Sequence, residues 1–250
     1  MALAYTSRAT TNNATDTDDP SVTTGSFTPS NDSLLVAVCL SQANAGTLDF
    51  SISGGSLTWT QRANAAASSF NMGGRIYTAP VSTGASMTVA VSTTAGFGAI
   101  TVAVVEFTGY DSASPIGATL GATTGSRGGA YSPALSGTSA ADSYVVAGGV
   151  SDSGNTVKGA SWTDIYDAVA ASGGTSHGST TEYIAGAVSA ADWSDFPSSF
   201  ATAAVAVEIK VASAASGQPS SKRHGGVPFM SMPGRRNVWA PVTSPHMKAA

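Results

Sequence analysis

The sequence predicts an all-β protein, a jelly-roll-like β-sandwich built from two similar halves with extended terminal arms. Three observations favour this fold. Apolar residues occur in short runs rich in β-branched side chains, such as LLVAVCL and ITVAVVEF, which clusters of Gly, Ser, Asn and Asp separate. No segment repeats its apolar residues with the period of a helix. The chain also contains an internal repeat.

The repeat pairs three segments of the first half with three segments of the second. DSLLVA at 32–37 matches DSYVVA at 142–147, LTWT at 57–60 matches ASWT at 160–163, and VVEF at 104–107 matches AVEI at 206–209. The order is the same, and the offsets are 110, 103 and 102 residues. A period of about 100 residues is too long for a solenoid and indicates a duplicated half-sandwich or small sandwich domain. Two tandem Ig-like sandwiches are therefore the alternative fold.

These patterns divide the chain into a polar N-terminal arm, a sandwich and an extended C-terminal arm. The expected bounds are 1–30 for the first arm, 31–211 for the β-sandwich and 212–250 for the second arm. Within the sandwich, the similar halves span 31–111 and 142–211, and a linker loop spans 112–141. Pro115, Pro133 and many glycines favour a loop in that linker.

Charge is sparse and unevenly distributed. Only 10% of the residues are charged, which is typical of a surface that itself packs against neighbours. The last 40 residues contain five lysines or arginines and no acid, whereas the first 210 contain six bases and 15 acids. The body is therefore acidic and the C-terminal arm is basic.

We expect no signal peptide and no membrane-spanning helix. The N-terminus lacks the basic region and apolar core of a signal peptide, so we expect synthesis in a cytoplasm. No apolar run approaches the roughly 20 residues of a membrane helix. Cys39 is the only cysteine, so an internal disulfide is ruled out, and its apolar surroundings predict a buried side chain.

We expect no enzymatic activity and no cofactor. GTSHG at 174–178 matches the nucleophile elbow G-x-S-x-G, but that motif requires a strand before it and a helix after it. Glu106 and Glu208 occupy equivalent places and could form the carboxylate pair of a glycosidase. Duplication of one structural position explains the two glutamates without catalysis, and we favour that interpretation.

No metal site is expected either. His177, His224 and His246 lie far apart and lack the spacing of a zinc site. Asp16, Asp18 and Asp19 are not followed by the glycine-centred loop that binds calcium.

Trp59 and Trp162 could stack on a sugar ring, as aromatic residues do on carbohydrate-binding sandwiches. Because they recur at equivalent places in the repeat, we favour a role in filling the ends of the core.

The C-terminal arm contains the candidate docking residues. A linker, ASAASGQPSS, precedes it, and five prolines are expected to keep it extended. Its large apolar side chains have no domain of their own, so we expect them to fill pockets on a partner while its arginines pair with acids there. The ratio of apolar to charged groups favours a protein partner over nucleic acid. The predicted docking residues are Lys222, Arg223, Val227, Pro228, Phe229, Met230, Met232, Arg235, Arg236, Val238 and Trp239.

The arm resembles the C-terminal endings of structural proteins of tailed bacteriophages in its pattern GGVPF followed by RRNVW. The body, in WTQR at 59–62, RIY at 75–77 and VEFTGYD at 105–111, is similar to the jelly-roll or Ig-like domains of phage head and surface proteins. The arm departs from the pattern because PVTSPHMKAA follows Trp239, which argues against this tryptophan as a cap of the chain end.

The resemblance implies a non-enzymatic virion protein, made in the host cytoplasm, that binds the major capsid protein or other virion proteins. We expect a capsid cement or decoration protein that forms a homo-oligomer. A neck or tail component is one alternative. A carbohydrate-binding β-sandwich module, which would use Trp59 and Trp162, is the other.

Overall fold

The computed structural model describes residues 2–17, 20–45, 48–67, 72–94, 96–124, 127–151, 156–172, 175–198 and 202–212. Every regular element in these ranges is a β-strand, which confirms the all-β prediction, and no helix in them could span a membrane. The strands are β1 (Ala4–Thr17), β2 (Ser21–Thr23), β3 (Ser33–Ala45), β4 (Phe50–Ser53), β5 (Thr60–Ala67), β6 (Met72–Val81), β7 (Ala90–Thr93), β8 (Gly96–Thr108), β9 (Ile116–Thr124), β10 (Arg127–Tyr131), β11 (Tyr144–Ser151), β12 (Val157–Lys158), β13 (Thr163–Ser172), β14 (Thr175–Ala185), β15 (Trp193–Ser198) and β16 (Thr202–Ile209).

Each half of the chain forms one five-stranded and one three-stranded antiparallel sheet. The first half has the strand orders β1-β8-β3-β6-β5 and β2-β7-β4. The second half has β9-β16-β11-β14-β13 and β10-β15-β12. Each strand of the first half thus corresponds to the strand numbered eight higher, so the two halves share one connectivity.

The two halves also share their strand register. Leu35 lies opposite Glu106 in the first half, and Val145 lies opposite Glu208 in the second, with the offsets that the sequence repeat predicts. In each half, the first strand pairs with the last strand, and the third strand pairs with the sixth. A jelly roll would also pair the fourth strand with the fifth, but β5 lies beside β6 instead. The strand order therefore establishes a duplicated sandwich without establishing a jelly roll.

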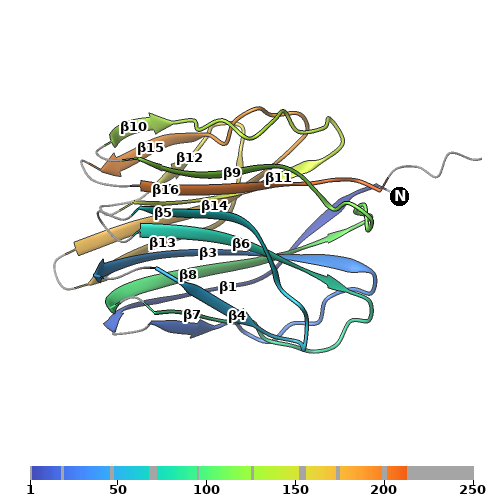
Figure 1. The fold of residues 1–250 in the computed structure, drawn as a ribbon, viewed down its shortest axis with the longest axis horizontal. Coiled ribbons are helices and arrows are strands. Elements are labelled where there is room, and N and C mark those ends of the chain that lie inside the picture. Colours follow the sequence, from blue (N-terminus) through green and yellow to red (C-terminus); the bar gives the residue numbers. More distant parts are fainter. Residues whose placement is uncertain are drawn as a thin grey trace, which may run out of the picture. The chain divides into compact units, whose positions relative to one another are not determined.

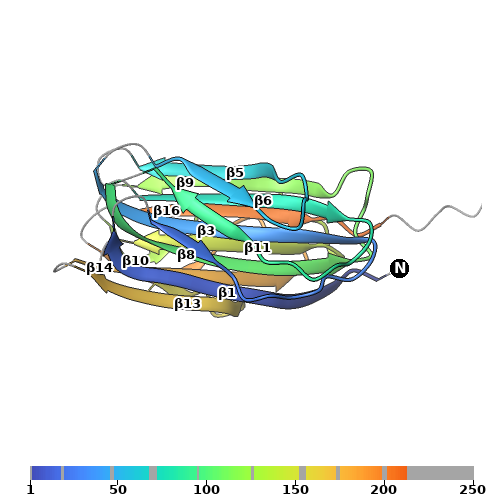
Figure 2. The same ribbon diagram turned by 90° about the horizontal axis from the view of Figure 1, so that it is seen from below.

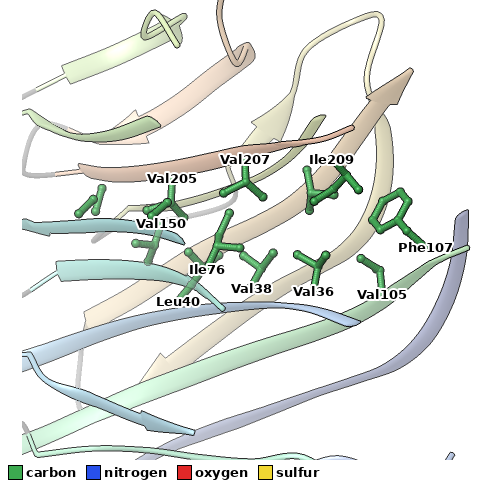
Figure 3. Packing of buried hydrophobic residues seen from close by; sticks show 14 of the residues in the cluster. Val36, Val38, Leu40, Ile76, Val105, Phe107, Val150, Val205, Val207 and Ile209 are labelled. Atoms are coloured by element: carbon green, nitrogen blue, oxygen red, sulfur yellow. The ribbon is translucent and has the colours of Figure 1, made fainter. Parts of the chain in front are cut away.

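The two five-stranded sheets pack face to face and share the central core (Figures 1 and 2). Alternation along each strand points every second side chain into this interface. Figure 3 shows Val36, Val38, Leu40, Ile76, Val105 and Phe107 from the first half against Val150, Val205, Val207 and Ile209 from the second. One sheet from each half thus builds the central sandwich, as the leading fold prediction has it.

The outer faces of the central sheets are covered by the three-stranded sheets. In the first half, Leu35, Ala37 and Cys39 of β3 pack against Val89 and Val91. The second half repeats this layer with its own apolar cluster, in which Val145 and Ala147 of β11 pack with Trp193 of β15. The compact unit, Met1–Ala214, is therefore a stack of four sheets. Each half also contains a small sandwich of its own, but the two halves share the central core and are not separate tandem sandwiches.

Two expected irregular segments contain strands. Residues 4–17 of the predicted N-terminal arm form β1, which pairs with β8 at the edge of a central sheet. Residues 116–131 of the predicted linker contain β9 and β10, and β9 pairs with β16. Both segments are polar or rich in glycine, so they lack the apolar alternation of a buried strand. Backbone hydrogen bonds to a neighbouring strand, which the local sequence does not reveal, order them.

Candidate functional site

The predicted docking residues, from Lys222 to Trp239, lie outside the residues that the structure describes. The last described strand, which ends at Ile209, is followed by three described residues that remain tied to the sandwich. Val211 forms a bridge with Tyr110, and the Ala212 amide donates to the Gly109 carbonyl at 2.9 Å. The C-terminal arm therefore starts from a firmly held end of the sandwich.

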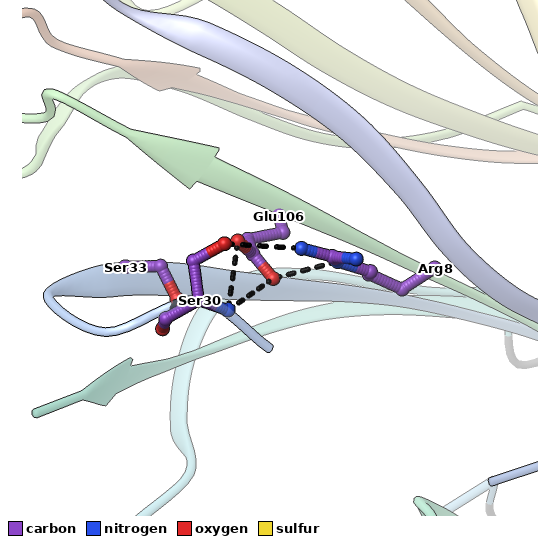
Figure 4. Close-up of polar contacts among 4 residues, drawn as sticks. All are labelled: Arg8, Ser30, Ser33 and Glu106. Carbon is purple, nitrogen blue, oxygen red and sulfur yellow. Dashed lines mark hydrogen bonds and ion pairs between the residues drawn. The ribbon is translucent and has the colours of Figure 1, made fainter. Parts of the chain in front are cut away.

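Glu106 lies on β8 and is 2% exposed. The Arg8 guanidinium donates from Nε to one carboxylate oxygen at 2.7 Å, and the Ser30 amide donates to both oxygens at 3.1 and 3.2 Å (Figure 4). Burial alone would raise the pKa of Glu106, but the hydrogen bonds from Arg8 and Ser30 outweigh it and lower the pKa. Glu106 thus fastens the edge strand β1 and the turn before β3 to the centre of the sheet.

Glu208 repeats this arrangement on β16 and is 4% exposed. The amides of Ala118 and Ala140 each donate to its carboxylate at 2.7 Å. Burial would raise its pKa, but these two amides, together with Ser143, outweigh burial and lower it. A Cβ at Gly117 would collide with the Glu208 carboxylate, so any side chain there would force this carboxylate to shift.

The two glutamates do not form a catalytic pair. Val105 and Phe107 point into the central core, so Glu106 between them points to the outer face of its sheet. Glu208 points outward in the same way between Val207 and Ile209. The two carboxylates therefore lie on opposite sides of a central sandwich about 10 Å thick. Their equivalence reflects one structural role used twice, which is the interpretation that the sequence favoured.

Two of the three tryptophans in the sandwich are buried. Trp162 is 4% exposed and Trp193 is fully buried, and both belong to the outer core of the second half. Trp59 is half-buried against the outer core of the first half, and its Nε1 donates to the Gly54 carbonyl at 3.4 Å. Trp162 presents no open ring face, so the structure contradicts its predicted stacking role and supports the core-filling role.

The motif GTSHG is not a nucleophile elbow. Its residues 175–178 lie inside β14, where Ser176 pairs with Ala171 and His177 pairs with Ala170 of β13. A strand continues through the described residues of the motif, whereas the elbow needs a sharp turn into a helix.

In the described ranges, no group of three or more His, Cys, Asp or Glu side chains could hold a metal ion. Cys39 is fully buried as predicted, and burial raises the pKa of its thiol. The thiolate form is thus disfavoured at this site.

A pocket of about 200 Å³ lies between β12 and the place where β13 pairs with β14. Asp164 and Asp167 line it together with Thr156 and Lys158. Asp164 pairs with Glu182 and Asp167 pairs with Thr180, so the three acids share one face of the sheet. We call this group, Asp164, Asp167 and Glu182, the acidic cluster.

Glu182 is the most unusual member of the acidic cluster. It is 0% exposed, and neither of its carboxylate oxygens has a hydrogen-bond partner in the part of the chain that the structure describes. Burial, with the neighbouring Asp164 and Asp192, raises the pKa of Glu182 to about 9, against the opposing effects of the nearby Gly159 amide and of Lys158. Burial and then Asp164 also raise the pKa of Asp167, against the opposing effects of Thr180 and Lys158.

Sequence reasoning missed the acidic cluster because Asp164 and Glu182 are separated along the chain, and only the pairing of β13 with β14 places them opposite each other. A comparison of the two halves of the internal repeat could have revealed the cluster. The equivalent positions in the first half are Gln61, Asn64 and Tyr77, all of them uncharged, so an alignment of the halves would have singled out the three acids.

Comparisons of this chain with protein-family models, with curated proteins and with solved structures find no match. The function must therefore be argued from the chain itself.

Proposed function

We propose that this chain is a non-enzymatic structural protein of a tailed-bacteriophage virion, a capsid cement or decoration protein that docks through its C-terminal arm. The observation that carries the proposal is the boundary of the compact unit. The sandwich closes at Ala214 with its cores filled by its own strands. The large apolar and basic side chains of the arm all follow that boundary.

The mechanism is burial of the arm at a junction between shell subunits. Phe229, Met230 and Trp239 would be the anchors, each worth about 2 kcal/mol or more when buried in a partner pocket. Lys222, Arg223, Arg235 and Arg236 would set the register by pairing with acids on the shell. Because such a junction exists only in the assembled shell, binding there favours assembly by mass action.

The sandwich would contribute a rigid, weakly charged body. Glu106 and Glu208 both fasten the turns and edge strands at the ends of their sheets, and the shared core joins the two halves. A body of this kind projects from a surface or bridges neighbouring subunits without changing shape, as a cement protein needs.

The first test is quantitative mass spectrometry of gradient-purified particles from the source. Hundreds of copies per particle are expected for a decoration protein. About a dozen copies or fewer would assign the chain to the neck or tail instead, and complete absence would overturn the virion proposal.

The anchors are tested by replacing Phe229 and Trp239 with alanine in the full chain. The double variant should lose attachment to particles while its far-ultraviolet circular dichroism stays that of a folded β-protein. Val242→Ala, a truncation of an apolar arm residue outside the anchor set, is the matched control and should attach normally. Normal attachment of the double variant would contradict the anchor role.

A further inference from the structure

The pocket beside the acidic cluster corresponds to a place that an arginine occupies in the first half. There, Arg75 of β6 is buried, and its guanidinium donates to the carbonyls of Ala65 and Gly74 at 3.0 Å and of Leu48 at 3.3 Å. The guanidinium also lies over the Phe50 ring, 5.4 Å from its centroid. The outer face of the first half is thus filled by its own cation.

The strand registers locate the same place in the second half. Asn64 pairs with Arg75, as Asp167 pairs with Thr180. The next pair, Ala65 with Gly74, corresponds to Ala168 with Ser179, and both of the latter residues line the pocket. A short threonine therefore stands where the first half has an arginine, and the pocket lies in the space that a long side chain fills in the first half.

The positions around that place are uncharged in the first half and acidic in the second. Gln61 corresponds to Asp164, and Tyr77 corresponds to Glu182. The Tyr77 hydroxyl donates a hydrogen bond to the Phe50 carbonyl at 3.2 Å. Glu182 has no such partner among the described residues. The second half thus has no arginine at the position of Arg75 and has carboxyl groups at the positions around it, two of which, Asp164 and Asp167, line the pocket.

We propose that this pocket binds the guanidinium group of an arginine side chain from a partner chain. A planar guanidinium matches carboxylate geometry through paired hydrogen bonds, and its weak hydration favours partly buried sites. A small divalent ion fits less well, since the acids do not converge into a group able to hold a metal ion. The pocket of about 200 Å³ accommodates a side chain of arginine's size.

The electrostatics support this assignment. Burial, and then the neighbouring Asp164, raise the pKa values of both Asp167 and Glu182, so the charged forms of these carboxyl groups are poorly stabilised by their surroundings. Lys158 lines the pocket, yet no ion pair within 4.0 Å joins it to a carboxylate in the described ranges. An incoming guanidinium would supply the missing positive charge.

The inference does not depend on the virion role, and the arginine has two available sources. One is the C-terminal arm of another copy, which contains Arg223, Arg235 and Arg236. The other is a different protein. The test therefore uses the full chain with these three arginines replaced by glutamine, so that the arm cannot compete.

The experiment is a nuclear magnetic resonance titration of this isotope-labelled chain with N-acetyl-arginine methylamide. The neutral citrulline analogue has nearly the same shape and is the control ligand. We expect saturable shifts of the Thr156 to Lys158 amides with the arginine ligand alone. Asp167→Asn should weaken binding about tenfold or more through loss of a charge-assisted hydrogen bond. Asp32→Asn, the same charge change in the first half, should not weaken it.

Equal shifts with arginine and citrulline, or unweakened binding by the Asp167→Asn chain, would overturn the proposal. Lys158→Gln adds a second check, because removal of the lining cation should tighten binding. Repeating the titration with the unmodified chain identifies the source. Weaker binding there that grows with the concentration of the chain points to the arm of another copy, whereas equal binding points to a different protein. Weaker binding that does not depend on the concentration would assign the pocket to the chain's own arm and would overturn the partner chain.

Discussion

The pKa values of buried carboxyl groups in this protein shift in opposite directions because the groups differ in the hydrogen-bond donors around them. Glu106 and Glu208 each accept hydrogen bonds from backbone amides, so their charged forms are favoured and their pKa values are lowered. Glu182 is equally buried but lacks a partner in the described part of the chain, so its neutral form is favoured. Residue type and burial alone do not decide whether the pKa is raised or lowered. The pKa is lowered where nearby N–H groups point at the carboxylate.

Glu182→Gln should stabilise the protein at alkaline pH. In the unfolded chain a glutamate loses its proton near pH 4.3, whereas folded Glu182 keeps it up to about pH 9. Stability contributed by this group is therefore complete below pH 4.3 and falls as the pH rises to 9. The variant does not show this loss of stability, because glutamine has no carboxyl proton to release. At pH 8 its free energy of unfolding should exceed the wild-type value by about 1 kcal/mol or more, and near pH 4 the two should agree.

Urea unfolding at several pH values measures this difference, and Glu208→Gln is the control of opposite sign. The lowered pKa of Glu208 gives stability that is present above pH 4.3 and lost as the pH falls through the folded pKa. Glu208→Gln should therefore destabilise by about 1–3 kcal/mol at pH 7, with a smaller loss near pH 3. A gap between Glu182→Gln and wild type that stays constant with pH would contradict the assignment.

The equivalent strands of the two halves follow the same path, but they differ in the residues that meet across the central core. Gly148 of β11 occupies the place that Val38 has in β3, and the two meet across the central core. A Cβ at Gly148 would lie 2.5 Å from the Val38 Cγ1, closer than carbon atoms approach. One copy of the strand therefore provides the protrusion and the other provides the space for it.

Gly148→Val, which restores the residue of the twin strand, should push the central sheets apart. We expect a loss of about 1–3 kcal/mol or more from overpacking, which lowers the melting temperature by about 2–4 °C per kcal/mol in a chain of this size. Thermal unfolding followed by circular dichroism measures the loss. Gly25→Ala is the control, because a Cβ there meets no atom within 4 Å. An unchanged melting temperature of Gly148→Val would show that the interface is not tightly packed.

A β-bulge also repeats in the edge elements. The register shifts between Gln61 and Ala63 in β5 and between Asp164 and Tyr166 in β13. These positions are equivalent, and the bulge turns Asp164 and Asp167 toward the same face of the sheet. The acidic cluster therefore depends on a backbone irregularity that hydrophobic periodicity does not indicate.

At the scale of the whole sandwich, the shared core couples the two halves. Neither five-stranded sheet can keep its inner face away from water without the other. We expect the compact unit to unfold in a single transition, even though the chain is duplicated.

Differential scanning calorimetry of paired core variants tests this coupling. Ile76 in the first half and Ile209 in the second are both fully buried in the central core. Ile76→Ala and Ile209→Ala should each lower the same transition, by about 2–5 kcal/mol of stability. Two separate transitions, each lowered by only one of the variants, would show that the halves fold independently.

The sequence by itself determined the all-β class, the duplication and most buried strands, because alternation and repetition are properties of the linear chain. It also marked the C-terminal arm by composition. Only the tertiary structure decided that polar β1 and β9 join the sheets and that Glu106 and Glu208 face apart. The tertiary structure likewise brought together Asp164, Asp167 and Glu182. These features depend on which backbone groups pair across the chain, and that choice is made by packing between distant segments rather than by any local pattern.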